Sequence, residues 1–167
     1  SAKKGKDQAA YYADALEKAF NQRPIIFFSN GYETYIWDDA FYAPRKVQGF
    51  YNKAALQSLI MRRSERKDLR QFQVNTNIAG RPYQLEAIQR IAENFVSFDK
   101  GSMAGRNRKA LLVMATGSGK TRTAAAIVDM MSKCNWAKRI LFLADRTALV
   151  KQAKNAFNEY LPNMSSI

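Results

Sequence analysis

The spacing of apolar residues in the first third of the chain predicts one helix followed by two strands. Residues 7–20 place apolar side chains three or four positions apart, which is typical of a helix with one apolar face. That face consists of Ala9, Ala13, Leu16 and Phe20. Residues 25–29 are mainly apolar, residues 32–37 are rich in aromatic and β-branched types, and Asn30-Gly31 between them favours a tight turn. We therefore expect a helix and a β-hairpin.

A second helix is predicted to begin after Asn52, whose side chain is suited to cap the first turn. Its inner face would carry Leu56, Leu59 and Ile60. The pattern then changes abruptly, because residues 61–70 are mostly charged and residues 71–80 are polar without periodicity. The basic run at 61–70 is either a solvated helix face or a strip that lies along a DNA backbone.

The loss of apolar periodicity marks a predicted domain boundary. A chain of 167 residues suits one domain or two small ones. We expect a first domain over residues 1–68, a linker over 69–80 and a second domain over 81–167.

Helix-like and strand-like segments alternate in the second half. Pro82 suits the first position of a helix, and the apolar face of that helix would consist of Leu85, Ile88, Ala92, Phe95 and Val96. Residues 101–105 are expected to form a loose loop. The apolar segments 110–115 and 139–144 predict two strands, each followed by a helix. This alternation is typical of a parallel α/β sheet, in which ligands bind at the carboxyl ends of the strands.

The two later helices each have a predicted apolar stripe. In the first helix the stripe consists of Ala124, Ile127, Val128 and Met131. The last helix should begin with Thr147 as its N-cap and stop near Pro162. Its stripe consists of Leu149, Ala153, Phe157 and Tyr160.

A glycine turn joins the first predicted strand of the second half to an alanine-rich helix. The candidate ligand-binding residues of this turn are Thr116, Gly117, Ser118, Gly119, Lys120 and Thr121. The glycines leave room at the main chain, and the amides of the turn together with the helix dipole favour an anion. Lys120 can reach the outer phosphates of a nucleotide, and the Thr121 hydroxyl can ligate Mg²⁺. The pattern predicts a phosphate-binding P-loop.

The P-loop pattern departs from the general motif at one position, where Met114 replaces the first glycine. The alternative is a structural glycine turn followed by a surface lysine. That alternative does not explain why Lys120 and Thr121 follow the second glycine at the start of a helix.

The charge balance narrows the class of partner. The chain has 27 Lys and Arg residues against 14 acidic residues, a formal charge of +13, which commonly marks a polyanion such as nucleic acid; charge that serves only solubility is the alternative. It has no histidine, so a zinc site or a histidine-based triad is not expected. The single Cys134 allows no internal disulfide and fits a reducing cytoplasm. No apolar run approaches the ~20 residues of a membrane span.

Two further segments resemble motifs of superfamily 2 helicase and translocase motors. Arg81-Pro82-Tyr83-Gln84 is similar to the glutamine motif, which implies that Gln84 reads adenine and Tyr83 packs on the base. The segment around Asp145-Arg146 resembles the motif that contacts the nucleic-acid backbone, which implies that Arg146 binds a phosphate. The alternatives are an exposed surface Gln84 and an Arg146 that pairs with Asp145.

The chain also resembles the motor subunit of type I restriction enzymes, in which a nuclease precedes a translocase of double-stranded DNA. The P-loop segment 112–124 and Phe142-Leu-Ala-Asp-Arg146 carry this resemblance in the second half. In the first third, Gln8 and Tyr12 match the Q-x-x-x-Y helix of such nucleases, and residues 27–39 match their closing hairpin.

The resemblance implies that Gln8 and Tyr12, one helical turn apart, contact DNA. The alternative places Tyr12 in the core under the strand at 25–29 and Gln8 on the helix surface. The implied fold is the C-terminal part of a restriction-endonuclease-like domain followed by the start of a RecA-like parallel α/β domain. The implied ligands are ATP and Mg²⁺, and the implied partners are double-stranded DNA and the methyltransferase and specificity subunits.

Both catalytic sites of this family need acidic motifs that have no match in the chain. We therefore expect an internal piece of a larger DNA translocase and endonuclease that by itself neither hydrolyses ATP nor cuts DNA. The other interpretations are a DNA-binding connector that does not hydrolyse ATP, or another superfamily 2 DNA or RNA helicase.

Overall fold

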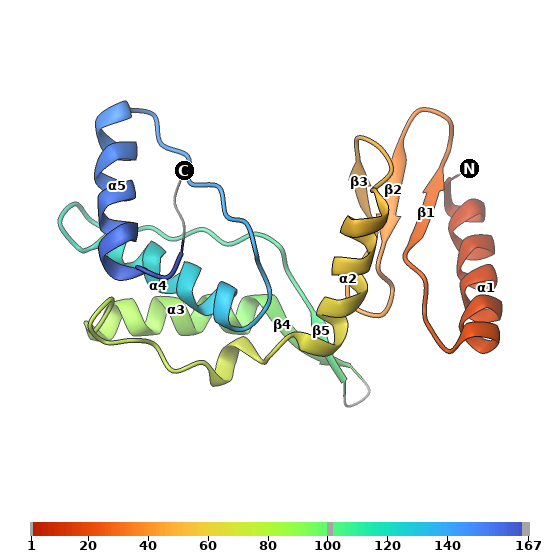
Figure 1. The fold of residues 1–167 in the computed structure, drawn as a ribbon, viewed down its shortest axis with the longest axis horizontal. Coiled ribbons are helices and arrows are strands. Elements are labelled where there is room, and N and C mark those ends of the chain that lie inside the picture. The colour runs from red at the N-terminus through yellow and green to blue at the C-terminus, as the bar shows by residue number, and fades with distance from the viewer. Residues whose placement is uncertain (1, 100–101, 165–167) are drawn as a thin grey trace. The chain divides into compact units, whose positions relative to one another are not determined.

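The computed structural model describes residues 2–99 and 102–164 (Figure 1). The chain divides into two compact units. Unit 1 consists of Ser1–Glu65 with Phe98–Gly105, and unit 2 consists of Arg66–Ser97 with Arg106–Ile167. Within the described ranges, no helix is both long enough and apolar enough to cross a membrane.

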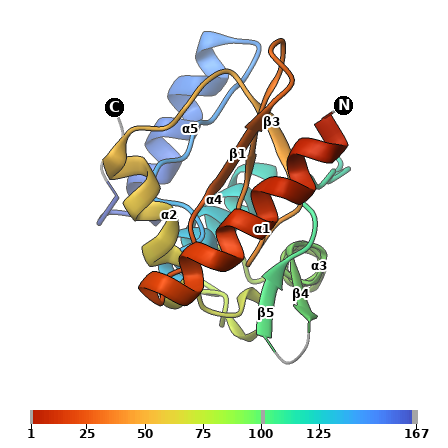
Figure 2. The same ribbon diagram turned by 90° about the vertical axis from the view of Figure 1, so that its right-hand side faces the viewer.

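Unit 1 contains a small antiparallel sheet with a helix packed on it. The elements in chain order are α1 (Ala2–Phe20), β1 (Ile26–Ser29), β2 (Thr34–Trp37), β3 (Arg45–Val47) and α2 (Lys53–Glu65). The strands lie in the order β1-β2-β3, and α1 packs against β1, as Figures 1 and 2 show. The buried apolar side chains of this unit are Ala13, Ile26, Ile36 and Phe41. The predicted helix and hairpin are confirmed.

The hairpin has a longer turn than its Asn30-Gly31 signal predicts. Ser29 pairs with Thr34, so the loop comprises residues 30–33. The Asn30 side-chain oxygen accepts hydrogen bonds from the backbone amides of Tyr32 and Glu33, at 3.1 and 2.8 Å. The Asn30 amide also donates to the Glu33 carbonyl at 3.3 Å. These bonds hold residues 30–33 in a turn, and β2 begins at Thr34 rather than at residue 32.

The N-cap of α2 is as predicted, whereas the predicted apolar faces of α1 and α2 are only partly buried. The Asn52 side chain accepts a hydrogen bond from the Ala55 amide at 2.9 Å. On α1, Ala13 is buried but Leu16 and Phe20 are exposed, and α2 buries no residue completely. The small sheet covers only part of α1, so the helical periodicity does not become a continuous core. The strand β3 was not predicted.

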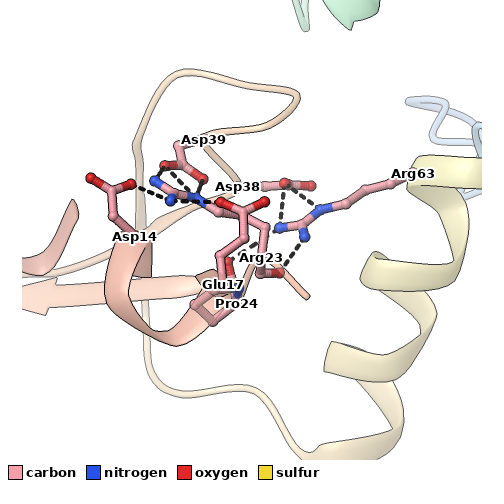
Figure 3. A network of polar contacts seen from close by, with 7 residues as sticks. All are labelled: Asp14, Glu17, Arg23, Pro24, Asp38, Asp39 and Arg63. Carbon is pink, nitrogen blue, oxygen red and sulfur yellow. Dashed lines mark hydrogen bonds and ion pairs between the residues drawn. The ribbon is translucent and has the colours of Figure 1, made fainter. Parts of the chain in front are cut away.

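A network of ion pairs joins α1, α2 and the loop after β2 in unit 1 (Figure 3). The Arg23 guanidinium donates to both oxygens of Asp39, with Nε at 3.0 and 3.1 Å, and it also contacts Asp14 and Glu17. The hydrogen bonds that Arg23 donates to Asp39 raise the pKa of Arg23 above its usual range.

The second arginine of this network comes from α2. Arg63 Nε donates to Asp38 Oδ1 at 2.9 Å, and its remaining nitrogens donate to the carbonyl oxygens of Arg23 and Pro24. The Asp38 side chain is only 8% exposed. Because carboxylates and guanidinium groups satisfy one another here, the network fastens three segments that are far apart in the sequence.

Unit 2 is mainly helical. It contains η1 (Leu69–Gln71), α3 (Pro82–Phe95), α4 (Lys120–Lys133) and α5 (Thr147–Tyr160). The helix α3 packs against η1 and α4, and α4 packs against α5. Ile88 and Ala92 of the predicted α3 face are buried, as is Ile91, and Val96 is buried just after the helix. The helix α5 ends before Pro162 as predicted, with Arg146 rather than Thr147 at its N-cap.

The predicted loop at 101–105 is wrong, apart from residue 101, which lies outside the described residues. The strands β4 (Val96–Asp99) and β5 (Ser102–Gly105) form a two-stranded sheet. Gly105 donates its amide to the Phe41 carbonyl at 2.9 Å and lies directly against the Tyr42 ring. A side chain at this position would overlap that ring, so the absence of a Cβ, not chain flexibility, is what this glycine contributes.

The parallel sheet predicted for the second half does not form within the described part of the chain. The segments 110–115 and 139–144 are not in strands, and Leu111 and Val113 are 87% and 89% exposed. Strands of this kind are stable only between neighbouring strands, and no described segment pairs with either of them.

The buried face of α4 also differs from the predicted stripe. The predicted stripe is only half-buried, and the buried residues are Thr123, Ala125, Ala126, Asp129 and Met130. The covering elements are α3 and α5. Because α3 and α5 cover α4 in place of the expected sheet, the buried side of α4 differs from the predicted one.

Trp136 fastens the start of unit 2 to the C-terminal end of α4. Its indole Nε1 donates to the Lys67 carbonyl at 2.8 Å, and the Lys67 amide donates to the Cys134 carbonyl at 3.0 Å. The Arg66 guanidinium lies 5.3 Å from the centroid of the Trp136 ring. The Trp136 side chain and the Cys134 backbone thus both contact residues 66–67.

Trp136→Phe should lower the free energy of unfolding by about 1 kcal/mol, because an aromatic ring is kept while the part-buried hydrogen bond to the Lys67 carbonyl is lost. Urea denaturation followed by circular dichroism measures the change. Trp37→Phe is the matched control, since the described residues give Trp37 no indole hydrogen bond. An equal loss in both variants would contradict a specific role for the Trp136 hydrogen bond.

Candidate functional site

The candidate site begins where a glycine turn enters α4. Gly117 and Gly119 have φ angles of 76° and 84°, a region that glycine adopts without strain. Gly119 is the N-cap of α4, and Lys120 is its first residue. The first amides of a helix have no partner within it, so the start of α4 presents unpaired donors and the positive end of the helix dipole. This geometry suits an anion.

The turn is closed by bonds to one carbonyl oxygen. The Ala115 oxygen accepts from the Ser118 hydroxyl at 2.6 Å and from Lys120 Nζ at 3.0 Å. The Lys120 ammonium is therefore held at the turn by this bond, in an exposed position. A phosphate that binds to the turn would meet this charge without a large movement of the side chain.

Thr121 follows at the second position of α4. Its hydroxyl makes no hydrogen bond among the described residues, so it is available as an oxygen ligand. An oxygen donor beside an anion site fits Mg²⁺, which is usually held by one or two protein oxygens together with substrate phosphates. Across the described ranges, no group of three or more Cys, Asp or Glu residues is placed to hold a metal by itself.

Gln84 lies against the turn from the first turn of α3. It is 3% exposed, and its Nε2 donates to the Ser118 carbonyl at 3.1 Å. Its Oε1 accepts from the Arg81 amide at 3.2 Å. The reverse orientation of the amide would oppose two donors, so these partners determine which atom is which. The alternative of an exposed surface glutamine is wrong.

Tyr83 reaches the same carbonyl from the other side of that helical turn. Its hydroxyl donates to the Ser118 oxygen at 2.9 Å and accepts from Arg81 Nη1 at 2.8 Å. This hydrogen bond to Tyr83 raises the pKa of Arg81. The Tyr83 side chain is 45% exposed, so its ring is open to a ligand. Sequence reasoning missed Arg81, because nothing in its local pattern shows where the guanidinium points.

The two glycines of the turn have different surroundings. A Cβ added at Gly119 would lie 2.5 Å from Gln84 Nε2, whereas one added at Gly117 would meet nothing within 4 Å. Gln84 therefore closes one side of the turn, and the other side is open. The structure thus brings together Tyr83, Gln84 and the turn at 116–121, which the sequence predicted separately.

Arg146 is not joined to this site by any hydrogen bond or ion pair among the described residues. It lies at the N-cap of α5, with its Nε 3.8 Å from Asp145 Oδ2, and both side chains are almost fully exposed. The distance fits the alternative in which Arg146 pairs with Asp145. Because exposed pairs contribute little, this pairing leaves Arg146 able to bind another anion.

Gln8 and Tyr12 form a second candidate site on α1 of unit 1. Gln8 Nε2 donates to the Tyr12 hydroxyl at 3.0 Å. Tyr12 is 56% exposed, so the alternative that buries it under the β1 strand is wrong. Lys6 Nζ lies 4.5 Å from the centroid of the Trp37 ring, while the side chains of Lys3 and Lys4 lie outside the described residues. The pair is accessible to a large ligand.

The family comparison decides the class of unit 2. The sequence model of the family described as "Type III restriction enzyme, res subunit" matches residues 77–167. The chain belongs to this restriction-enzyme family. The match covers α3, the P-loop turn, α4 and α5, so the residues around Ser118 lie inside the matched range.

Two proteins with sequences similar to this chain are endonuclease subunits of type I restriction enzymes. The type I restriction enzyme EcoAI endonuclease subunit of Escherichia coli is 49% identical over 82 residues, which is 49% of this chain and 9% of the relative. The EcoKI endonuclease subunit of Escherichia coli strain K12 is 42% identical over 79 residues, 47% of this chain and 6% of the relative. The chain thus spans less than a tenth of the length of either relative. No solved structure matches it significantly.

Proposed function

We propose that this chain is the part of a type I restriction enzyme endonuclease subunit in which a nuclease domain is joined to an ATP-driven DNA translocase. Residues 1–68 would be the C-terminal remainder of the nuclease, 69–80 a linker, and 81–167 the start of a RecA-like motor domain. The family match over 77–167 supports the motor part, and the identity to the two E. coli subunits supports a restriction enzyme endonuclease subunit.

One structural observation carries the nucleotide-binding part of the proposal. Tyr83 and Gln84 both donate to the Ser118 carbonyl, across more than thirty residues of sequence. A base-reading motif and a phosphate-binding turn can serve one nucleotide only if they lie side by side, and these contacts bring them together. A binding site for ATP is the simplest explanation of that arrangement.

Each residue of the site has a proposed task. Lys120 would bind the outer phosphates, the amides at 117–121 would surround them, and the Thr121 hydroxyl would ligate Mg²⁺. A bound Mg²⁺ would neutralise charge on the phosphates. Gln84 would read the adenine and Tyr83 would pack beside it. Arg146 would bind a backbone phosphate of DNA.

The chain's formal charge of +13 supports double-stranded DNA as the partner. We further propose that the methyltransferase and specificity subunits of a restriction complex are protein partners, and that the complex works in the cytoplasm. These proposals follow from the identity to the endonuclease subunits of EcoAI and EcoKI.

The decisive experiment is ATP hydrolysis by the intact subunit with and without duplex DNA. We expect hydrolysis that requires Mg²⁺ and is stimulated several-fold by duplex DNA. ATP binding without hydrolysis under either condition would favour a DNA-binding connector instead. Stimulation by RNA but not by duplex DNA would favour a helicase of another kind.

Gln8→Ala should reduce DNA cleavage by the intact subunit about ten-fold or more while ATP hydrolysis is unchanged. The Gln8 amide and the Tyr12 hydroxyl can both donate to phosphate oxygens, which would hold the strand for cutting, and they lie in unit 1, separate from the P-loop. Tyr12→Phe should act in the same direction, because it removes the hydroxyl.

Tyr11→Phe is the matched control for this prediction, since Tyr11 is the exposed neighbour of Tyr12 and makes no hydrogen bond among the described residues. Its cleavage rate should equal that of the wild type. A parallel loss of ATP hydrolysis and cleavage in Gln8→Ala would indicate general destabilisation and would remove Gln8 from the DNA-binding site.

A further inference from the structure

The Ser118 carbonyl receives two side-chain donors that differ in what else they can do. The Tyr83 hydroxyl and the Gln84 amide approach it at 2.9 and 3.1 Å. Ser118 is the residue between the two glycines of the P-loop, and the direction of its carbonyl sets the plane of the peptide that joins it to Gly119. Whatever holds this carbonyl holds the shape of the phosphate-binding turn.

Arg81 determines the direction of the Tyr83 proton. A guanidinium has donors only, so the Tyr83 oxygen must be the acceptor of the 2.8 Å bond from Arg81 Nη1. The single hydroxyl proton of Tyr83 is then directed to the Ser118 oxygen. A charged donor on a hydroxyl strengthens the bond that the hydroxyl donates. Arg81, Tyr83 and Ser118 thus form a chain of two hydrogen bonds with one direction.

The Gln84 amide makes hydrogen bonds both to the turn and to the Arg81 backbone. Its Oε1 accepts from the Arg81 amide with one lone pair, and the second Nε2 proton has only the Gly119 carbonyl, 3.5 Å away. One lone pair and one weakly held proton are left, which is the donor–acceptor pair that an adenine edge requires. Tyr83, by contrast, has used its only proton on the turn.

We propose that the Tyr83 hydroxyl is a positioning group for the P-loop: directed by Arg81, it holds Ser118 independently of the base, and Gln84 is the residue whose hydrogen bonds link the base to the turn. This inference rests on the proposed nucleotide site and assigns Arg81 and the Tyr83 hydroxyl a role in it. The consequence is that loss of the hydroxyl weakens the binding of every polyphosphate equally.

Equilibrium binding of ATP, GTP and inorganic tripolyphosphate to the intact protein tests the proposal. Tyr83→Phe keeps the ring and removes only the hydroxyl. We expect it to weaken binding of all three ligands by about three- to ten-fold, the range for one lost hydrogen bond, with the ATP-to-GTP ratio unchanged. Arg81→Met should weaken all three in the same direction by a smaller factor, because the backbone amide that bonds Gln84 remains.

Gln84→Ala provides the opposite pattern. It should lower the ATP-to-GTP ratio while its effect on tripolyphosphate stays smaller than its effect on ATP. Tyr11→Phe, in unit 1, is the control and should bind all three ligands like the wild type. Circular dichroism melting of each variant shows whether it is folded.

Two results would overturn the inference: unchanged tripolyphosphate binding in Tyr83→Phe, or a loss confined to ATP. Lys120→Ala separates these outcomes from a failure of the nucleotide site itself. If Lys120→Ala binds tripolyphosphate like the wild type, the P-loop assignment fails. If Lys120→Ala loses binding and Tyr83→Phe does not, only the positioning role of Tyr83 fails.

Discussion

Lys120→Ala is expected to weaken ATP binding by roughly 100-fold or more, equivalent to about 2.7 kcal/mol, and to abolish ATP-driven translocation. The Lys120 ammonium lies 3.0 Å from the Ala115 carbonyl, over the turn. Lys120 thus places a positive charge directly at the turn. Loss of Lys120 removes the positive charge held at the Ala115 carbonyl, and the unpaired amides at the start of α4 cannot replace a full charge.

Isothermal titration with ATP and a steady-state ATPase assay measure the effect. Lys133→Ala is the matched control, because Lys133 lies at the other end of the same helix and pairs with Asp129 at 2.9 Å. It should change ATP affinity less than about three-fold, because Lys133 lies at the end of α4 opposite the P-loop turn. ATP hydrolysis at the wild-type rate in Lys120→Ala would show that the turn does not bind the phosphates.

Arg63→Ala should lower the free energy of unfolding of unit 1 by about 3 kcal/mol. Removing the guanidinium leaves the buried Asp38 carboxylate without its 2.8 Å ion pair and leaves the Arg23 and Pro24 carbonyls without a donor. Breaking one partner of a buried ion pair costs more than the pair contributes, because an uncompensated charge is left behind. Urea denaturation followed by circular dichroism measures the loss.

Arg90→Ala is the comparison for this second prediction. Arg90 is 72% exposed and pairs with Glu86 and Glu93 along α3, so its removal should cost less than about 0.5 kcal/mol. In the double variant Arg63→Met with Asp38→Leu, the buried charge is gone from both sides, and part of the lost stability should return. A loss for Arg63→Ala no larger than that for Arg90→Ala would show that the network does not hold unit 1 together.

The sequence by itself determined the features that depend on neighbouring residues. Pro82 predicted the start of α3, Asn52 the cap of α2, and Asn30-Gly31 the position of the first turn. The glycines and Lys120 predicted a turn that enters a helix. Each signal acts within a few residues, through a fixed φ angle, a missing amide proton or a short side chain that bonds to nearby backbone.

Only the tertiary structure decided which distant groups meet. Gln84 is buried, Tyr83 bonds to Ser118, and Arg63 pairs with Asp38. In each case the side chain depends on residues more than twenty positions away in the sequence. The segments at 110–115 and 139–144 are apolar enough for strands, yet they have no strand partners among the described residues. Periodicity in the sequence indicates which side of a helix or strand is apolar. The segment that covers that side comes from elsewhere in the fold, and the free energy of the buried contact depends on that segment.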